Sequence, residues 1–60
     1  MLKATQAIAI IRSRIDSIRN KVWKGDITVL EGSKQVKALV EQLKPNTEDW
    51  DIVEAALAEM

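Results

Sequence analysis

The sequence predicts an all-α protein, a small antiparallel three-helix bundle with helices at about residues 4–24, 27–43 and 47–59. Two observations support this prediction. Apolar side chains recur at steps of three and four residues in each segment, which places them on one face of an α-helix. Two short breaks, around Gly25 and around Pro45, separate the segments. Short connections favour antiparallel neighbours, so the three helices should run up, down and up.

The first helix has the clearest apolar pattern in the chain. Its seam consists of Ala4, Ile8, Ile11, Ile15, Ile18 and Val22. The residues between them are largely Arg, Lys, Ser, Asn and Gln, so the back of this helix is polar and basic. Gly25 should supply the left-handed residue that ends the helix at Lys24, and Asp26 should cap the next one. Because the core needs the seam, we expect the functional surface to lie elsewhere.

The second helix has a similar seam with a glycine inside it. The seam residues are Val29, Gly32, Val36, Leu39, Val40 and Leu43. A helix-interior glycine costs about 1 kcal/mol relative to alanine, so Gly32 indicates a close approach of two helix backbones. In an alternative interpretation the helix begins with Ser33 as its cap, and 27–31 forms a looser turn. Pro45 should disfavour helical geometry at Lys44 and stop the helix there.

The third helix is short, and Asn46 or Thr47 should cap it. Its apolar stripe is predicted to contain Trp50, Val53, Ala56, Leu57 and Met60. The up-down-up order places Trp50 beside Ala4 and Ile8. A helix of this length cannot reach the other end of the bundle, so the end that holds Val22 and Trp23 should stay partly bare.

Self-association is the expected way to stabilise so small a chain. Domains below about 70–80 residues often need a disulfide, a metal or a partner, and the sequence contains no Cys and no His. Several apolar residues lie off the three seams and could form a contact with a second copy or with another protein. The predicted interface residues are Ile10, Arg14, Ile27 and Leu30.

The net charge is zero, but the charges are segregated along the chain. Residues 1–24 carry six bases and one acid, a net charge of +5, whereas residues 45–60 carry five acids and no base. Much of this pattern complements the helix dipoles, because bases gather at the end of the first helix and acids at the start of the last. It also permits nucleic-acid binding by the first helix, through Arg12, Arg14, Arg19 and Lys21.

Catalysis is not expected. The chain has no His, Cys or Tyr, the common general bases and nucleophiles, and its two glycines are isolated, so there is no phosphate-binding loop. We expect no metal and no cofactor. No apolar run approaches the about 20 residues that span a bilayer, and no signal peptide is recognisable, which favours a cytoplasmic protein without membrane contact.

The sequence therefore favours a small non-catalytic regulator or inhibitor that binds another protein, in the style of phage accessory proteins, as a homo-oligomer. One alternative is an oligomer that sequesters a nucleotide or cyclic dinucleotide. Its site would combine an aromatic ring, a cation and free backbone N–H groups, supplied by Trp23, Lys24 and Thr28. Nucleic-acid binding by the first helix is the other alternative.

Overall fold

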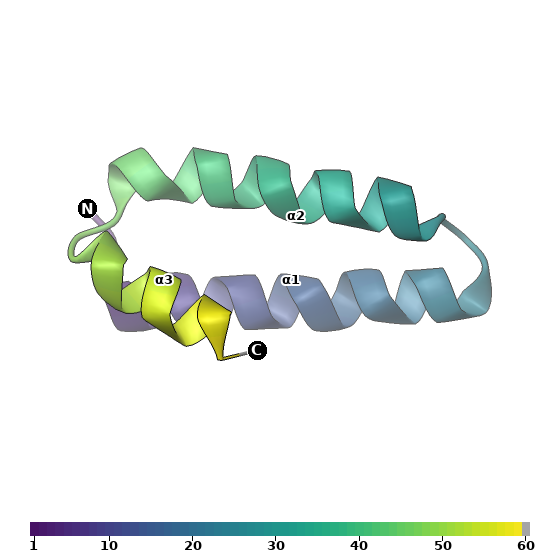
Figure 1. The fold of residues 1–60 in the computed structure, drawn as a ribbon, viewed down its shortest axis with the longest axis horizontal. Coiled ribbons are helices and arrows are strands. Elements are labelled where there is room, and N and C mark those ends of the chain that lie inside the picture. Colours follow the sequence, from purple (N-terminus) through teal and green to yellow (C-terminus); the bar gives the residue numbers. More distant parts are fainter. Residues whose placement is uncertain (60) are drawn as a thin grey trace.

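The computed structural model describes residues 1–59 and confirms the predicted fold class (Figure 1). The elements in order are α1 (Ala4–Lys24), α2 (Val29–Leu43), the 3-10 turn η1 (Lys44–Asn46) and α3 (Trp50–Ala58). α1 and α2 form a long antiparallel hairpin, and α3 packs mainly on α1. The molecule measures 35 × 19 × 15 Å. Met60, a predicted member of the third apolar stripe, lies outside the described residues.

The turn that ends α1 has the predicted glycine at its centre. Gly25 adopts the left-handed conformation with φ of 81°, and its N–H donates to the carbonyl of Val22 at 3.0 Å. The N–H of Asp26 donates to the carbonyl of Lys21 at 2.9 Å. These two bonds satisfy carbonyls that have no partner within the helix, so α1 ends at Lys24 as predicted.

α2 begins at Val29, two residues later than the main prediction and four residues before the alternative start at Ser33. Its cap is Thr28, whose Oγ1 accepts a hydrogen bond from the N–H of Glu31 at 3.1 Å. The prediction that Asp26 caps α2 is wrong. The chain reverses direction over residues 25–27, and only then is an extended residue, Thr28, available as the cap.

The predicted end of the second helix at Leu43 is confirmed, but the expectation that Lys44 is not helical is wrong. Lys44 is helical, with φ of −51° and ψ of −51°, and its N–H donates to the carbonyl of Val40. The preference against helical geometry before proline is a bias that local structure can overcome. Pro45 lies in the first turn of η1, where its missing N–H removes no hydrogen bond. The helical path therefore continues past Leu43 and tightens into η1 before it ends.

Asn46 and Thr47 cap the end of α2, which corrects the prediction that one of them caps the third helix. The Asn46 Nδ2 group donates to the carbonyl of Gln42 at 3.2 Å. The Thr47 hydroxyl donates to the carbonyl of Leu43 at 2.7 Å, and Thr47 is itself buried. Their side chains bond backward because the helix before them leaves free carbonyls at its C-terminal end.

α3 begins at Trp50, three residues later than predicted. The residue before it, Asp49, has a φ of 52°. Within residues 1–59 it is the only non-glycine residue with a positive φ. The N-terminal segment fixes the connection between η1 and α3. The N–H of Leu2 donates to the carbonyl of Asn46, and the carbonyl of Leu2 accepts a hydrogen bond from the N–H of Glu48, both at 2.8 Å. The N-terminal segment is thus joined through backbone hydrogen bonds to the connection between η1 and α3.

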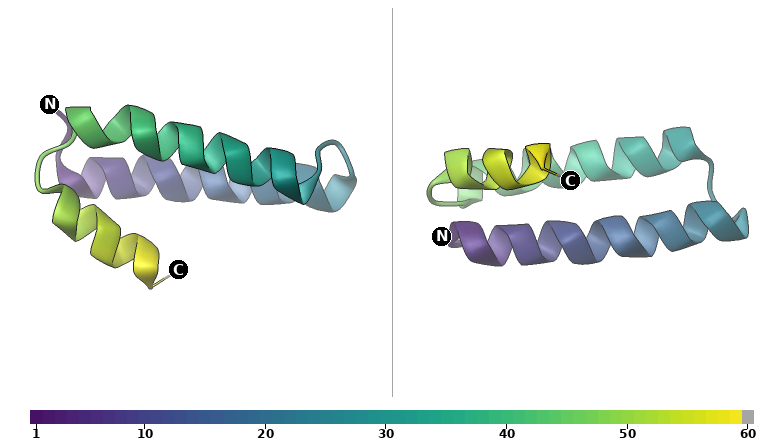
Figure 2. Two further views of the ribbon diagram at one scale, coloured as in Figure 1. Left: turned by 45° about the horizontal axis from the view of Figure 1, so that its top comes forward. Right: turned by 60° about the horizontal axis from the view of Figure 1, so that its bottom comes forward.

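The core lies where α3 crosses α1. The buried apolar residues are Ala4, Ala7, Ile11 and Val53. Trp50 and Leu57 pack against them, which confirms the predicted position of Trp50 at the Ala4 end of the bundle. α3 covers only the half of the hairpin near the N-terminus, and its axis runs obliquely to the hairpin (Figure 2).

Candidate functional site: the groove between α1 and α2

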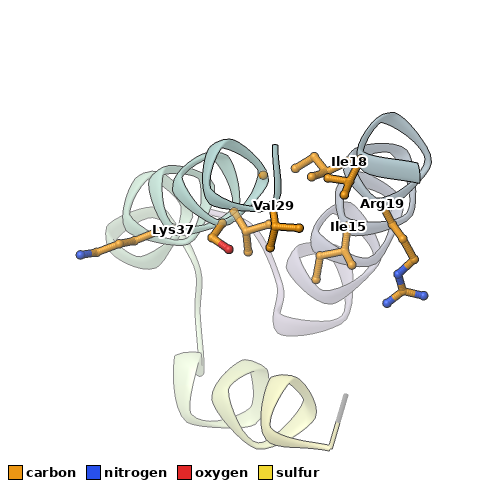
Figure 3. Close-up of a pocket in the computed structure, with 9 residues that line it drawn as sticks. Ile15, Ile18, Arg19, Val29 and Lys37 are labelled. Atoms are coloured by element: carbon orange, nitrogen blue, oxygen red, sulfur yellow. The ribbon is translucent and has the colours of Figure 1, made fainter. Parts of the chain in front are cut away.

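A groove of about 430 Å³ lies between α1 and α2, in the half of the hairpin nearest its connecting turn. It exists because α3 is too short to cover this half. α1 is about 31 Å long and α3 only about 14 Å, at about 1.5 Å per residue. The groove opens on the side of the hairpin on which α3 lies (Figure 3).

The lining of the groove is mainly apolar. Its apolar side chains are Ile15, Ile18 and Val22 from α1 and Val29 and Val36 from α2. Four of them are half-buried, and Val29 is 70% exposed. This corrects two predictions, since Val29 was assigned to the buried seam and the whole seam of α1 was assigned to the core. The physical reason is that a seam is buried only where a third helix lies on it.

Gly32 is the only buried residue of α2 and forms part of the groove. A Cβ atom at this position would lie 2.9 Å from Cγ2 of Ile18 and 3.3 Å from Cγ2 of Val22. The separation from Ile18 is shorter than non-bonded carbon atoms adopt, and the separation from Val22 is tight, so the glycine allows the isoleucine of α1 to approach the backbone of α2. This is the close approach that Gly32 predicted.

The rim of the groove is positively charged. Arg19 of α1 and Lys37 of α2 line opposite sides, and Figure 3 shows their charged ends pointing outward, away from the apolar floor. Arg12 and Asp16 extend the Arg19 side into a neighbouring hollow of about 280 Å³. A ligand in the groove would therefore meet an apolar floor between two cationic edges, the arrangement that suits an amphipathic segment with acidic flanks.

The predicted interface residues do not share one surface. Leu30 is 65% exposed and lies at the turn end of the hairpin, whereas Ile10 is 36% exposed and lies in the second turn of α1. Along α1, about 20 Å separate Ile10 from the turn. Ile27 is half-buried, and its Cδ1 would lie 3.9 Å from a Cβ atom at Gly32, so the hairpin itself already uses part of this side chain. As an interface, the set stays a prediction.

The residues proposed for a nucleotide site lie near one another in the chain at the turn. Trp23 is 77% exposed, and Lys24 and Thr28 are exposed as well. The Thr28 hydroxyl already accepts the N–H of Glu31, and the Glu31 carboxylate adds negative charge to the first turn of α2. An anion at the start of α2 would therefore be repelled by the Glu31 carboxylate, and the N–H of Glu31 would not be free to bind it. The nucleotide hypothesis stays a prediction.

The four basic residues proposed for nucleic-acid binding are all exposed, but they divide between two flanks of α1. Arg12 and Arg19 line the hollow on the groove side. Arg14 lines a different hollow, of about 250 Å³, with Gln35, Leu39 and other α2 residues. Lys21 lines none of these hollows. This separation gives no single basic surface, and nucleic-acid binding stays a prediction.

The sequence contained a signal for the groove, because a short third helix was expected to leave the Val22–Trp23 end bare. It did not indicate that Val29 and Val36 would line the same opening, or that Lys37 and Arg19 would lie on its two edges. Helical spacing assigns residues to a face, but the position of α3 decides which part of that face is covered.

No protein-family model, no curated protein and no solved structure matches this chain. None of the helices within residues 1–59 combines the length and hydrophobicity that a membrane crossing needs. Within the same residues, no group of three or more acidic side chains is arranged to hold a metal ion. The functional argument therefore depends on the groove and its charges.

Proposed function

We propose that this protein is a non-catalytic, protein-binding regulator whose groove between α1 and α2 receives one face of an amphipathic helix. The observation that supports this proposal most directly is the groove itself, an apolar opening of about 430 Å³ between two helices. Grooves of this kind bind helices whose apolar residues recur at positions i, i+3, i+4 and i+7. The lack of His, Cys and Tyr favours binding over catalysis.

The rim defines the chemistry of the bound helix. Arg19 and Lys37 lie on opposite edges, so acidic residues that flank the apolar face of the partner would meet a cation on either side. Such charges raise the association rate and select between partners more than they raise affinity. We therefore propose that the partner helix is apolar on one face and acidic along both borders.

A designed peptide tests the proposal. The probe is a helical peptide with Leu at positions i, i+4, i+7 and i+11 and Glu along both borders of this stripe. A second peptide replaces each Glu with Lys. Backbone amide shifts of the ¹⁵N-labelled protein should change at Gly32 and Ser33 with the Glu peptide and much less with the Lys peptide. Shifts that gather around Ile10 and Arg14 instead would contradict the proposed site.

Two neighbouring residues give a matched pair of variants for this titration. Val29 and Leu30 are both in the first turn of α2 and are similarly exposed, at 70% and 65%, but only Val29 lines the groove. Val29→Glu should abolish binding of the Glu peptide, because it places an acid at the apolar floor. Leu30→Glu should leave binding unchanged. Equal effects of the two substitutions would show that the groove is not the binding surface.

A further inference from the structure

The groove has room for one more helix of the size of α3. α3 occupies about 14 Å of a hairpin about 31 Å long, which leaves about 17 Å of the α1–α2 seam uncovered. The uncovered part lies on the same side of the hairpin as α3 (Figure 3). A second nine-residue helix would fit end to end with α3 and would complete the layer that α3 begins.

The outer face of α3 has the chemistry that the groove requires. With Val53 buried and Trp50 and Leu57 packed on the core, helical spacing turns the opposite face outward. The residues of this face, all exposed, are Asp51, Ile52, Ala55, Ala58 and Glu59. Ile52 is the one large apolar residue on this face, and its side chain is 54% exposed in a single copy of the chain. Along the helix, Ile52, Ala55 and Ala58 therefore lie between an acid in the first turn, Asp51, and an acid just after the last turn, Glu59.

The charges on the two surfaces are complementary. The groove presents Arg19 and Lys37 at its edges, and the outer face of α3 presents Asp51 and Glu59. Two grooves placed face to face would instead bring four cations together, which like-charge repulsion disfavours. A contact through α3 pairs each cation with an acid.

We infer that the occupant of the groove is α3 of a second copy of this chain, in a reciprocal two-fold dimer. In this dimer the two hairpins run antiparallel and the two α3 helices lie end to end between them. Each α3 contacts its own hairpin through Val53 and the groove of the other copy through Ile52. In a two-fold dimer the contact between α3 and the groove forms twice, once with α3 from each copy. The inference rests on the proposed function, since both require the groove to bind a helix.

A charge exchange between two variants tests this arrangement. The groove variant carries Arg19→Glu and Lys37→Glu, and the helix variant carries Asp51→Lys and Glu59→Lys. Alone, each variant places like charges at both contacts and should be monomeric in sedimentation velocity, where the unmodified protein is dimeric. Mixed in equal amounts, the variants should form a 1:1 heterodimer, because every contact is again between opposite charges. Native mass spectrometry distinguishes this heterodimer from either homodimer if one variant is ¹⁵N-labelled.

Two controls keep the test independent of folding. The two changes on α3 have opposite effects on its dipole, one at the first turn and one at the end, so its helicity should be retained. Far-ultraviolet circular dichroism checks this for both variants. Arg14→Glu is the matched charge reversal on the other flank of α1, and it should leave the dimer intact. Dissociation by Arg14→Glu, or failure of the mixed variants to associate, would overturn the inference.

The peptide titration separates this inference from the proposed function. If the unmodified protein is monomeric but its Gly32 and Ser33 amides respond to the Glu peptide, the occupant is another protein and the second copy is excluded. If the charge exchange restores a dimer but the Glu peptide causes no amide shifts in the monomeric helix variant, the groove binds only α3. In that case the proposed binding of other proteins is wrong. If the unmodified protein is monomeric and the Glu peptide causes no amide shifts, both the proposed function and the inferred dimer are wrong.

Discussion

Gly32 controls how closely α1 and α2 approach. The Cγ2 atom of Ile18 occupies the space where a side chain at Gly32 would begin, at 2.9 Å from an ideal Cβ position. This methyl group is attached directly to the Cβ of Ile18, so it cannot move away unless the side chain changes rotamer or the helices separate. The absence of a side chain at Gly32 therefore allows α1 and α2 to approach this closely.

Gly32→Ala should destabilise the protein by about 1 kcal/mol. The change gains about 1 kcal/mol of helix propensity, but forcing a methyl group into a packed contact costs about 1–3 kcal/mol. Urea unfolding followed by circular dichroism measures the difference. Ser33→Ala is the control, because Ser33 is exposed and should gain a few tenths of a kcal/mol from propensity alone. A Gly32→Ala protein as stable as Ser33→Ala would contradict the observed packing.

At this scale the sequence predicted some features and not others. The closure at Gly25 and the close approach at Gly32 were predictable, because glycine at these places has few other physical explanations. The roles of Thr28 and Thr47 were not. A Thr or Asn beside a helix end can bond forward or backward, and the tertiary contact decides the direction. Leu2 holds the connection to α3, and this contact from the far end of the sequence has no local signal.

α3 is the element that defines the site. Its apolar stripe and its short length were both predictable, so its position at the Ala4 end was predicted correctly. The later start, at Trp50, was not predictable because it depends on the left-handed conformation of Asp49 and on the two backbone bonds made by Leu2. The lengths of the helices predicted which part of the hairpin α3 leaves uncovered. They did not predict the charged residues at the rim of the groove.

The two tryptophans report the position of α3 directly. Trp50 is half-buried against the core, and its Nε1 donates to Glu54 at 3.0 Å, whereas Trp23 is 77% exposed. Trp23→Phe leaves only Trp50, whose emission should be blue-shifted and weakly quenched by acrylamide. Trp50→Phe leaves only Trp23, whose emission should resemble that of free tryptophan. Trp23→Phe should change stability by less than about 0.5 kcal/mol, as a surface substitution.

Unfolding provides the control for this comparison. In high urea both single-tryptophan variants should show the same emission maximum and the same quenching. A native difference that vanishes on unfolding locates Trp50 in the folded core. Equal quenching in the native state would mean that α3 does not pack on α1 as described.

The whole molecule separates its charges between its two ends in sequence. The first 24 residues carry a net charge of +5 and the last 16 a net charge of −5. In one copy, α3 packs on α1 through apolar residues, so the acids on its outer face and the cations at the groove face solvent. Reciprocal association would bring these opposite charges together without changing the net charge of zero.

Thermal stability should therefore depend on protein concentration. If the dimer is the folded form, a tenfold higher concentration should raise Tm by on the order of 4 °C, because association stabilises the native state by mass action. The helix variant with Asp51→Lys and Glu59→Lys should show no such dependence. Calorimetry at several concentrations measures both. Raising the ionic strength from about 0.05 M to about 0.5 M should reduce the slope for the unmodified protein, since salt screens exposed ion pairs.

The backbone bonds between Leu2 and the segment before α3 have a consequence for the order of folding. α1 and α2 are joined by four residues, so their hairpin can close rapidly through local contacts. The bonds from Leu2 to Asn46 and Glu48 join residues more than 40 positions apart and must wait until nearly the whole chain is available. We expect the hairpin to form first, with its entire seam open, and α3 to dock last. During synthesis the nascent hairpin would thus present an uncovered surface to any helix nearby.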